Sequence, residues 1–121
     1  MKKVLIVDDS ETIRQEVSRT LGNAGFATVE ACDGIEALDR IAEGNFSLVI
    51  LDVNMPRLSG LDLLDRLQQD PKTAQIPVIM LTTEAQRSMI DRARKGGAKG
   101  WLIKPVLMEH LVTAVTKLAA A

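Results

Sequence analysis

Three aspartates, two threonines and a lysine stand directly after short apolar runs, at four separate places in the chain. They are Asp8 and Asp9, Asp52, Thr82 and Thr83, and Lys104. Asp52 is the least expected of these residues, because desolvation makes a charge at the end of a core strand costly. If these runs end near one another, the carboxylates repel, and at least one of their pKa values rises unless a cation intervenes.

A pocket of this composition favours phosphoryl chemistry. Hard oxygen ligands with access to water suit Mg²⁺, which keeps several waters and takes few protein carboxylates. Bound Mg²⁺ and the ammonium of Lys104 would hold an anion with several oxygens, and the hydroxyl of Thr82 would donate to another of them. A free carboxylate that faces such a site can act as a nucleophile and form an acyl phosphate.

Short β-branched runs alternate with longer amphipathic stretches along the chain, and this alternation must position the polar residues. We expect strands at 2–7, 26–31, 46–51, 76–81 and 99–103, and helices at 10–25, 34–44, 58–70, 83–97 and 107–121. Such units, with continuous apolar strands, favour an α/β fold: a five-stranded parallel sheet with helices on both faces. Five strands are too few for an eight-stranded barrel. We therefore expect a flavodoxin-like doubly wound sheet with strand order 2-1-3-4-5, forming a single domain over residues 1–121 with no output domain.

In such a sheet, ligands bind at the carboxyl ends of the strands. Any one of the polar residues there could be a solvated loop or cap residue. Four strands that bring carboxylates, hydroxyls and an ammonium to one edge are harder to explain in that way. The second strand ends in Cys32 and Asp33, which lie to one side in the expected order, and we interpret Cys32 as a packing residue.

Local signals predict the helix ends and the buried helix faces. Ser10 is the expected N-cap of the first helix, and Pro71 is expected to stop the third. Helical spacing predicts buried faces that contain Ile13, Val17, Leu21 and Ala24 in the first helix and Leu107, Leu111, Val115 and Leu118 in the last.

The motifs "VDDS", "LDVNMPRLSG", "MLTTE" and "GWLIKP" occur in this order, each at the end of a predicted strand. Together they resemble the receiver domain of two-component response regulators, and the resemblance covers essentially the whole chain. It implies that Asp52 is the phospho-acceptor, which takes a phosphoryl group from a histidine kinase and loses it by autodephosphorylation. It also implies that Asp9, Asp52 and the backbone carbonyl of Asn54 bind Mg²⁺ directly, with Asp8 acting through water. Such a chain catalyses only its own phosphorylation and dephosphorylation, so we do not expect an enzyme.

The same resemblance assigns roles to residues around the acceptor. Thr82 would be the switch hydroxyl and Lys104 the phosphate-binding ammonium. Gly60 would shape the loop after the acceptor strand, and a cis peptide bond would precede Pro105.

Three further positions concern rate and signalling. Asn54 and Glu84 match family positions that flank the hydrolytic water, so we predict that they set the lifetime of the phosphorylated state. The alternative for Glu84 is a first-turn acid favoured by a helix dipole.

Trp101 stands where the family usually has Tyr or Phe, which rotates inward as Thr82 moves. Its indole N–H needs a partner when buried. We predict that Trp101 reports phosphorylation through its fluorescence, and a partly exposed packing residue is the alternative.

The helix expected at 83–97 is the most polar one and carries Arg87, Arg92, Arg94 and Lys95. By the resemblance, this fourth helix forms the signalling face together with the fifth strand and fifth helix. We predict that a protein target docks there when Asp52 is phosphorylated, with Arg92 and Lys95 among its contacts. The stretches "TTEAQ" and "GAKGWLIKP" favour the stand-alone chemotaxis type of regulator, whose target is the flagellar motor switch. A phosphatase is a further candidate partner.

The composition excludes several other classes of function. A net charge of -1 gives no support for binding nucleic acid or an acidic membrane through bulk electrostatics, and two Phe and one Trp provide no base-stacking platform. The apolar runs are too short to cross a bilayer, and the two aspartates near the N-terminus interrupt any signal peptide. A single cysteine excludes an internal disulfide and fits a reducing cytoplasm.

The same motifs are also compatible with other classes of protein. A Mg²⁺-dependent aspartyl phosphatase of the haloacid dehalogenase type would need a second aspartate where this chain has Asn54, and a cap domain. A flavodoxin would share the fold but needs a Ser/Thr/Gly-rich phosphate loop where this chain has "DDSETI". A receiver that binds partners without phosphorylation, a phosphorelay shuttle or sink, and a receiver excised from a longer regulator are the remaining alternatives.

Overall fold

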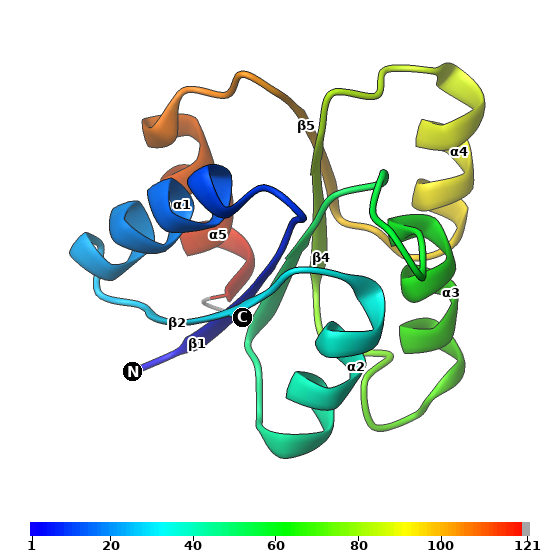
Figure 1. Ribbon diagram of the computed structural model, residues 1–121, viewed down its shortest axis with the longest axis horizontal. Coiled ribbons are helices and arrows are strands. Elements are labelled where there is room, and N and C mark those ends of the chain that lie inside the picture. The colour runs from blue at the N-terminus through cyan, green and yellow to red at the C-terminus, as the bar shows by residue number, and fades with distance from the viewer. Residues whose placement is uncertain (120–121) are drawn as a thin grey trace.

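The computed structural model describes residues 1–119, which are built around one five-stranded sheet (Figure 1). The strands are β1 (Lys3–Val7), β2 (Ala27–Ala31), β3 (Leu48–Leu51), β4 (Val78–Thr82) and β5 (Gly100–Ile103). They lie in the order β2-β1-β3-β4-β5, and every neighbouring pair is parallel. The predicted fold class and strand order are confirmed.

Five helices follow the strands within residues 1–119. They are α1 (Glu11–Asn23), α2 (Gly34–Glu43), α3 (Gly60–Gln69), α4 (Arg87–Lys95) and α5 (Met108–Ala119). Figure 1 shows α1 and α5 on one face of the sheet and α2, α3 and α4 on the other. Ser10, Asp33 and Ser59 accept backbone N–H groups at the starts of α1, α2 and α3, so the predicted N-cap Ser10 is confirmed. In this described part of the chain, no helix has the length and apolar character needed to cross a bilayer.

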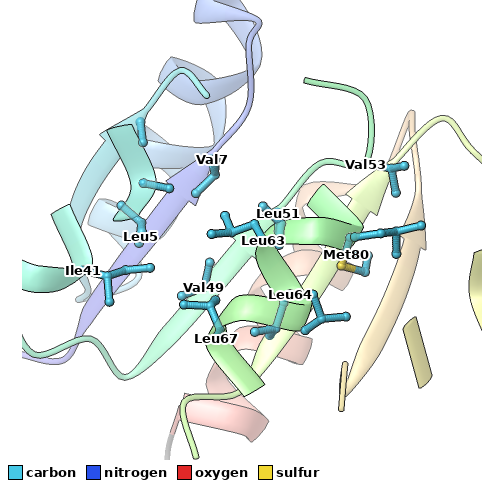
Figure 2. Close-up of a cluster of buried hydrophobic side chains, with 14 of the residues drawn as sticks. Leu5, Val7, Ile41, Val49, Leu51, Val53, Leu63, Leu64, Leu67 and Met80 are labelled. Carbon is cyan, nitrogen blue, oxygen red and sulfur yellow. The ribbon is translucent and has the colours of Figure 1, made fainter. Parts of the chain in front are cut away.

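The sheet is buried on both faces. Because side chains alternate along a strand, Leu5 and Val7 point toward α2 and α3, whereas Val4 and Ile6 point toward α1 and α5. Figure 2 shows the first of these layers, in which the labelled strand residues meet three leucines of α3, namely Leu63, Leu64 and Leu67. Burial on both sides explains the continuous apolar strands, and it makes their carboxyl ends a rigid mount for polar side chains.

Two residues predicted on buried helix faces are exposed. Ala24 follows the last residue of α1, at the point where Gly25 adopts a φ of 98° and turns the chain toward β2. Leu107 is 60% exposed because it precedes α5, where its carbonyl oxygen accepts the N–H groups of His110 and Leu111. The spacing rule was wrong at both places, since spacing does not show where a helix ends.

Helix α4 begins later than the sequence predicts. The expected start was residue 83, but α4 starts at Arg87, and Gln86 at its N-cap makes no side-chain capping hydrogen bond. The preceding residues 83–86 are irregular and run beside the polar edge of the sheet. At the other end of the chain, the predicted helix 107–121 is observed as α5, and residues 120 and 121 lie outside the described residues.

Candidate functional site

Three strands deliver the charged centre of the site. Asp8 and Asp52 follow β1 and β3 and are only 2% and 7% exposed, and Lys104 follows β5. The Nζ atom of Lys104 lies 2.6 Å from Oδ2 of Asp8 and 3.0 Å from Oδ2 of Asp52. Backbone hydrogen bonds continue past the strand ends, because the N–H of Asp52 donates to Val7 and that of Lys104 donates to Thr82. The sheet itself therefore fixes the positions from which these side chains extend.

Asp9 completes an acidic cluster with Asp8 and Asp52. One carboxylate oxygen from each of these residues lies within 4.8 Å of the other two. Asp9 is exposed whereas Asp8 and Asp52 are buried, so the cluster opens to water on the side of Asp9. Converging carboxylate oxygens with access to water are the donor set that Mg²⁺ prefers, and the residues present therefore fit this ion.

The charges in this pocket are incompletely balanced, since one ammonium faces three carboxylates. Burial raises the pKa of the Asp8 carboxyl, and hydrogen bonds from Lys104 and from the N–H of Ser10 offset only part of that rise. Burial also draws the pKa of Lys104 downward, but its hydrogen bonds to Asp8 and Asp52 outweigh this effect and the pKa ends above its ordinary value. The lysine is therefore held in its charged form, and one more cation would stabilise the pocket.

Glu84 connects the loop after β3 with Thr82 and Trp101. The Nδ2 of Asn54 donates to Oε1 of Glu84 at 2.7 Å, and the N–H of Glu84 donates to the hydroxyl of Thr82 at 3.2 Å. The indole N–H of the half-buried Trp101 donates to the carbonyl oxygen of Glu84 at 2.9 Å. Glu84 precedes α4, so the alternative that it is a first-turn acid of that helix is wrong.

Backbone geometry shapes the remaining walls. Gly60 donates its N–H to the carbonyl of Val53 at 2.9 Å, and a Cβ atom at this position would overlap the carbonyl oxygen of Asp52. Only glycine fits there without moving the backbone at the end of β3. The peptide bond between Lys104 and Pro105 is cis. The N–H of Asn54 donates to Oδ1 of Asp52 at 3.4 Å, so the loop returns toward the carboxylate that precedes it.

Sequence reasoning missed two arginines that hold the loops of this site. The Nη1 of Arg14 donates to the carbonyl oxygen of Asp8 at 2.7 Å, and its Nε donates to Glu30 at 3.2 Å. The Nε and Nη2 of Arg57 each lie 3.0 Å from a carboxylate oxygen of Asp33. The two acids lie 16 and 24 positions away in the chain, and no local pattern marks such pairs.

One residue of the basic helix α4 makes contacts within the chain that the sequence did not predict. The Nη2 of Arg92 lies 3.1 Å from Asp62 and 2.8 Å from Asp65, both on α3. Arg92 therefore ties α4 to α3, and because the residue is also exposed, its contact with a partner stays a prediction. Lys95 is exposed, and its contact with a partner stays a prediction.

Comparisons with known proteins agree with this geometry. A family model described as the response regulator receiver domain matches residues 4–116. The chain is 38% identical to the chemotaxis protein CheY of Pseudomonas aeruginosa, over 96% of this chain and 94% of that protein. It is 39% identical to chemotaxis protein CheY-3 of Vibrio cholerae, with coverage of 96% and 90%. Among solved structures, chemotaxis protein CheY4 of Vibrio cholerae superposes with a TM-score of 0.92 at 39% identity and covers 98% of both chains.

Proposed function

Because this chain belongs to the response regulator receiver domain family, we propose that it is a phosphorylation-dependent signalling switch with Asp52 as its phospho-acceptor. The observation that carries this proposal is the contact of Asp52 with Lys104 within the acidic cluster at the carboxyl edge of the sheet. Asp52 is mounted on a strand buried on both faces, and such mounting supports in-line transfer, which needs a fixed nucleophile.

In the forward step, a histidine kinase would present a phosphoryl group on an imidazole nitrogen. A carboxylate oxygen of Asp52 attacks the phosphorus, a P–O bond forms as the P–N bond breaks, and the imidazole keeps the electron pair and takes up a proton. The ammonium of Lys104 would neutralise one phosphoryl oxygen, and the hydroxyl of Thr82 would donate to another. Asp9, Asp52 and the Asn54 carbonyl, with Asp8 through water, would hold Mg²⁺, which supplies further neutralisation of the phosphoryl oxygens.

Hydrolysis would end the signal. Water attacks the phosphorus of the acyl phosphate, the P–O bond to Asp52 breaks, and inorganic phosphate and a proton are released. The hydrogen bond between Asn54 and Glu84 supports a shared role for these side chains in placing that water. The chain would turn over only its own phosphoryl group, so we propose a switch and not an enzyme with a separate substrate.

Phosphorylation would be sensed through Thr82, Glu84 and Trp101. If the hydroxyl of Thr82 turns toward a phosphoryl oxygen, its contact with the N–H of Glu84 changes. The indole of Trp101 donates to the carbonyl of the same Glu84, so its environment would change as well. Because Trp101 is the single tryptophan of the chain, its fluorescence would report this step directly.

A protein target would dock on the face formed by α4, β5 and α5. Arg87, Arg94 and Lys95 are exposed on α4, and this charge favours a partner with an acidic segment. The relatives named as chemotaxis proteins support a chemotaxis role, in which the target would be the flagellar motor switch. A phosphorelay shuttle or sink is the alternative, and a phosphatase would be a further partner in either pathway.

The phosphodonor would reach Asp52 beside an apolar groove. This groove lies between α1 and the segment after β5 and is lined by Ile13, Val17, Pro105, Val106 and Met108, with Lys104 at its edge. An apolar surface next to the charged pocket suits a kinase helix that carries its phosphorylated side chain at the margin.

The test is to incubate the chain with Mg²⁺ and acetyl phosphate and to measure bound phosphoryl groups over time. We expect one phosphoryl group per chain, none in Asp52→Asn, and slow loss that Asn54→Ala and Glu84→Ala change. Steady hydrolysis of an unrelated phosphate ester would instead support the aspartyl phosphatase. If acetyl phosphate and a histidine kinase both leave the wild-type chain unmodified, the proposal is wrong.

A further inference from the structure

We propose that Arg14 and Arg57 are positioning residues that anchor the two ligand-bearing loops of the site to acids on the β2 side of the sheet. The inference rests on the proposed function, because it concerns the same divalent cation site. One loop joins β1 to α1 and carries Asp9, and the other joins β3 to α3 and carries Asn54. Each loop is held by one of these arginines.

Arg14 fixes the first loop through its backbone. The Nη1 donates to the carbonyl oxygen of Asp8 at 2.7 Å, and the planar peptide that contains this oxygen leads directly into Asp9. The side chain of Arg14 is 15% exposed, and its Nε donates to Oε1 of Glu30 on β2 at 3.2 Å. The N–H of Asp8 also donates to Ala31, the last residue of β2. Asp8 and the start of Asp9 are therefore oriented from the β2 side.

Arg57 fixes the second loop through a two-point contact. Its Nε and Nη2 each lie 3.0 Å from the carboxylate of Asp33, an arrangement that sets direction as well as distance. Arg57 adopts a φ of 69°, which is costly for a residue with a Cβ and persists only where other contacts enforce it. The next residue, Leu58, packs against Gly34 so closely that a Cβ there would lie 2.6 Å from that of Leu58. Asp33 thus holds the loop in a backbone shape that it would not adopt alone.

The repulsion between the carboxylates of the pocket explains why the two loops need to be anchored. These carboxylates repel one another, and the loops that bear them would separate if they were free to move. Mg²⁺ requires near-ideal octahedral geometry, so each ångström of loop displacement weakens its binding. Groups outside the ligand set that orient the ligands typically contribute about ten- to a hundred-fold to metal affinity. The two arginines would supply this orientation without touching the cation.

The test measures Mg²⁺ binding by titration calorimetry in the full chain. Arg57→Gly removes the ion pair and relieves the backbone strain, and Asp33→Asn removes the same pair while keeping an N-cap for α2. We expect each to weaken Mg²⁺ binding about tenfold. The double variant should be no weaker than either single one, since both remove one contact. Arg14→Met should act in the same direction and keep the apolar stem of the arginine.

Arg40→Ala is the matched control. Arg40 lies on α2, the helix that Asp33 caps, and its ion pair with Glu43 is exposed and 3.9 Å long. It should leave Mg²⁺ affinity unchanged. Amide hydrogen exchange provides a second measurement, and the amides of Asn54 and Leu58 should lose protection in Arg57→Gly but not in Arg40→Ala. Arg57→Lys should restore part of the affinity, because it keeps the charge and one donor.

The outcomes separate this inference from the proposed function. If the wild-type chain is phosphorylated and Arg57→Gly, Asp33→Asn and Arg14→Met bind Mg²⁺ as the wild type does, the anchors are wrong and the switch stands. If these variants weaken Mg²⁺ binding while no donor phosphorylates the wild type, the switch is wrong and the anchors stand. Additive losses in the double variant would also overturn the anchor of Arg57, because they would show two separate effects.

Discussion

Two buried aspartates follow neighbouring strands of the sheet, and their surroundings shift their pKa values in opposite directions. Asp8, at the end of β1, is 2% exposed, and burial raises the pKa of its carboxyl. Asp33, just beyond β2, is 8% exposed, and the hydrogen bond from Arg57 lowers the pKa of its carboxyl. The first belongs to a pocket with excess negative charge, and the second belongs to an anchor whose charges are matched.

The difference shows that matched charges and surplus charges have different effects on this chain. The carboxylate of Asp33 and the guanidinium of Arg57 neutralise each other, which stabilises the fold and holds a loop in place. This pair leaves no surplus negative charge that would attract a cation. The surplus of carboxylates around Asp8 destabilises the folded chain in the absence of a cation, and a bound cation would relieve this repulsion. Neutralising Asp8 and neutralising Asp33 should therefore change the free energy of unfolding in opposite directions.

The largest effect should come from the glycine that closes the pocket. In Gly60→Ala the new Cβ would overlap the carbonyl oxygen of Asp52 and lie 2.8 Å from its carbonyl carbon, so the end of β3 or the loop must shift. We expect a loss of about 3 kcal/mol in the free energy of unfolding, measured by urea denaturation. Gly100→Ala in β5 is the control, because its nearest neighbours lie 3.7 Å away and it should be nearly neutral. Equal effects of the two substitutions would contradict the geometry around Gly60.

The next largest effect should be a gain in the free energy of unfolding from Asp8→Asn without added Mg²⁺, because burial and neighbouring carboxylates disfavour the charged form of Asp8. Asn keeps a carbonyl oxygen for the N–H of Ser10 and removes one of the repelling charges. The folded pKa of Asp8 lies above its unfolded value. The wild type is therefore most stable while this carboxyl is protonated, and it loses stability as the pH rises through the folded pKa. The two proteins should unfold alike near pH 3 and differ at pH 7. Thermal unfolding across this pH range checks the expectation, and a less stable variant at pH 7 would contradict it.

A smaller effect of the opposite sign is expected for Asp33→Asn. The folded pKa of Asp33 lies below its unfolded value, so its stabilisation is present above the ordinary carboxyl pKa and is lost as the pH falls through the folded one. The variant should be less stable than the wild type at pH 7 and should converge with it in acid. The loss should be modest, because the Arg57 side chain is 58% exposed and solvent screens the pair. Asp39→Asn, which removes an exposed carboxylate from α2, is the control and should change the stability at pH 7 much less.

The smallest effect should come from Trp101→Phe, which lies outside both regions. It removes the hydrogen bond from the indole to the carbonyl of Glu84 and should cost about 0.5 kcal/mol in chemical denaturation. The pH dependence of unfolding should match that of the wild type. A change in that dependence would mean that Trp101 is coupled to the pocket even without phosphorylation.

The sequence was sufficient for the fold and for the centre of the site because both depend on local patterns. Continuous apolar strands predict a sheet covered on both faces, and the residue after each strand must lie at the same edge, as Asp8, Asp52 and Lys104 do. Helix ends were less predictable: α4 starts at Arg87 and not at residue 83, since Glu84 makes tertiary contacts with Asn54 and Trp101 that no helical pattern reveals.

The anchors could not be predicted from the sequence for a related reason. Arg14 pairs with Glu30 and Arg57 with Asp33, and each pair becomes adjacent only after the sheet has formed. A surface arginine in a polar helix or loop is also compatible with full solvation. Arg92 is a further example, since its ion pairs with Asp62 and Asp65 join two helices that are distant in the chain.

The most direct test of the central claim is to locate the phosphoryl group. The chain would be phosphorylated with acetyl phosphate and Mg²⁺, reduced with borohydride, which converts an aspartyl phosphate into homoserine, and then digested and analysed by mass spectrometry. We predict a single converted residue, Asp52, and no conversion when Mg²⁺ is removed. Conversion at Asp8 or Asp9 instead, or a phosphoryl group on a side chain outside the pocket, would contradict the assignment of Asp52 as the acceptor.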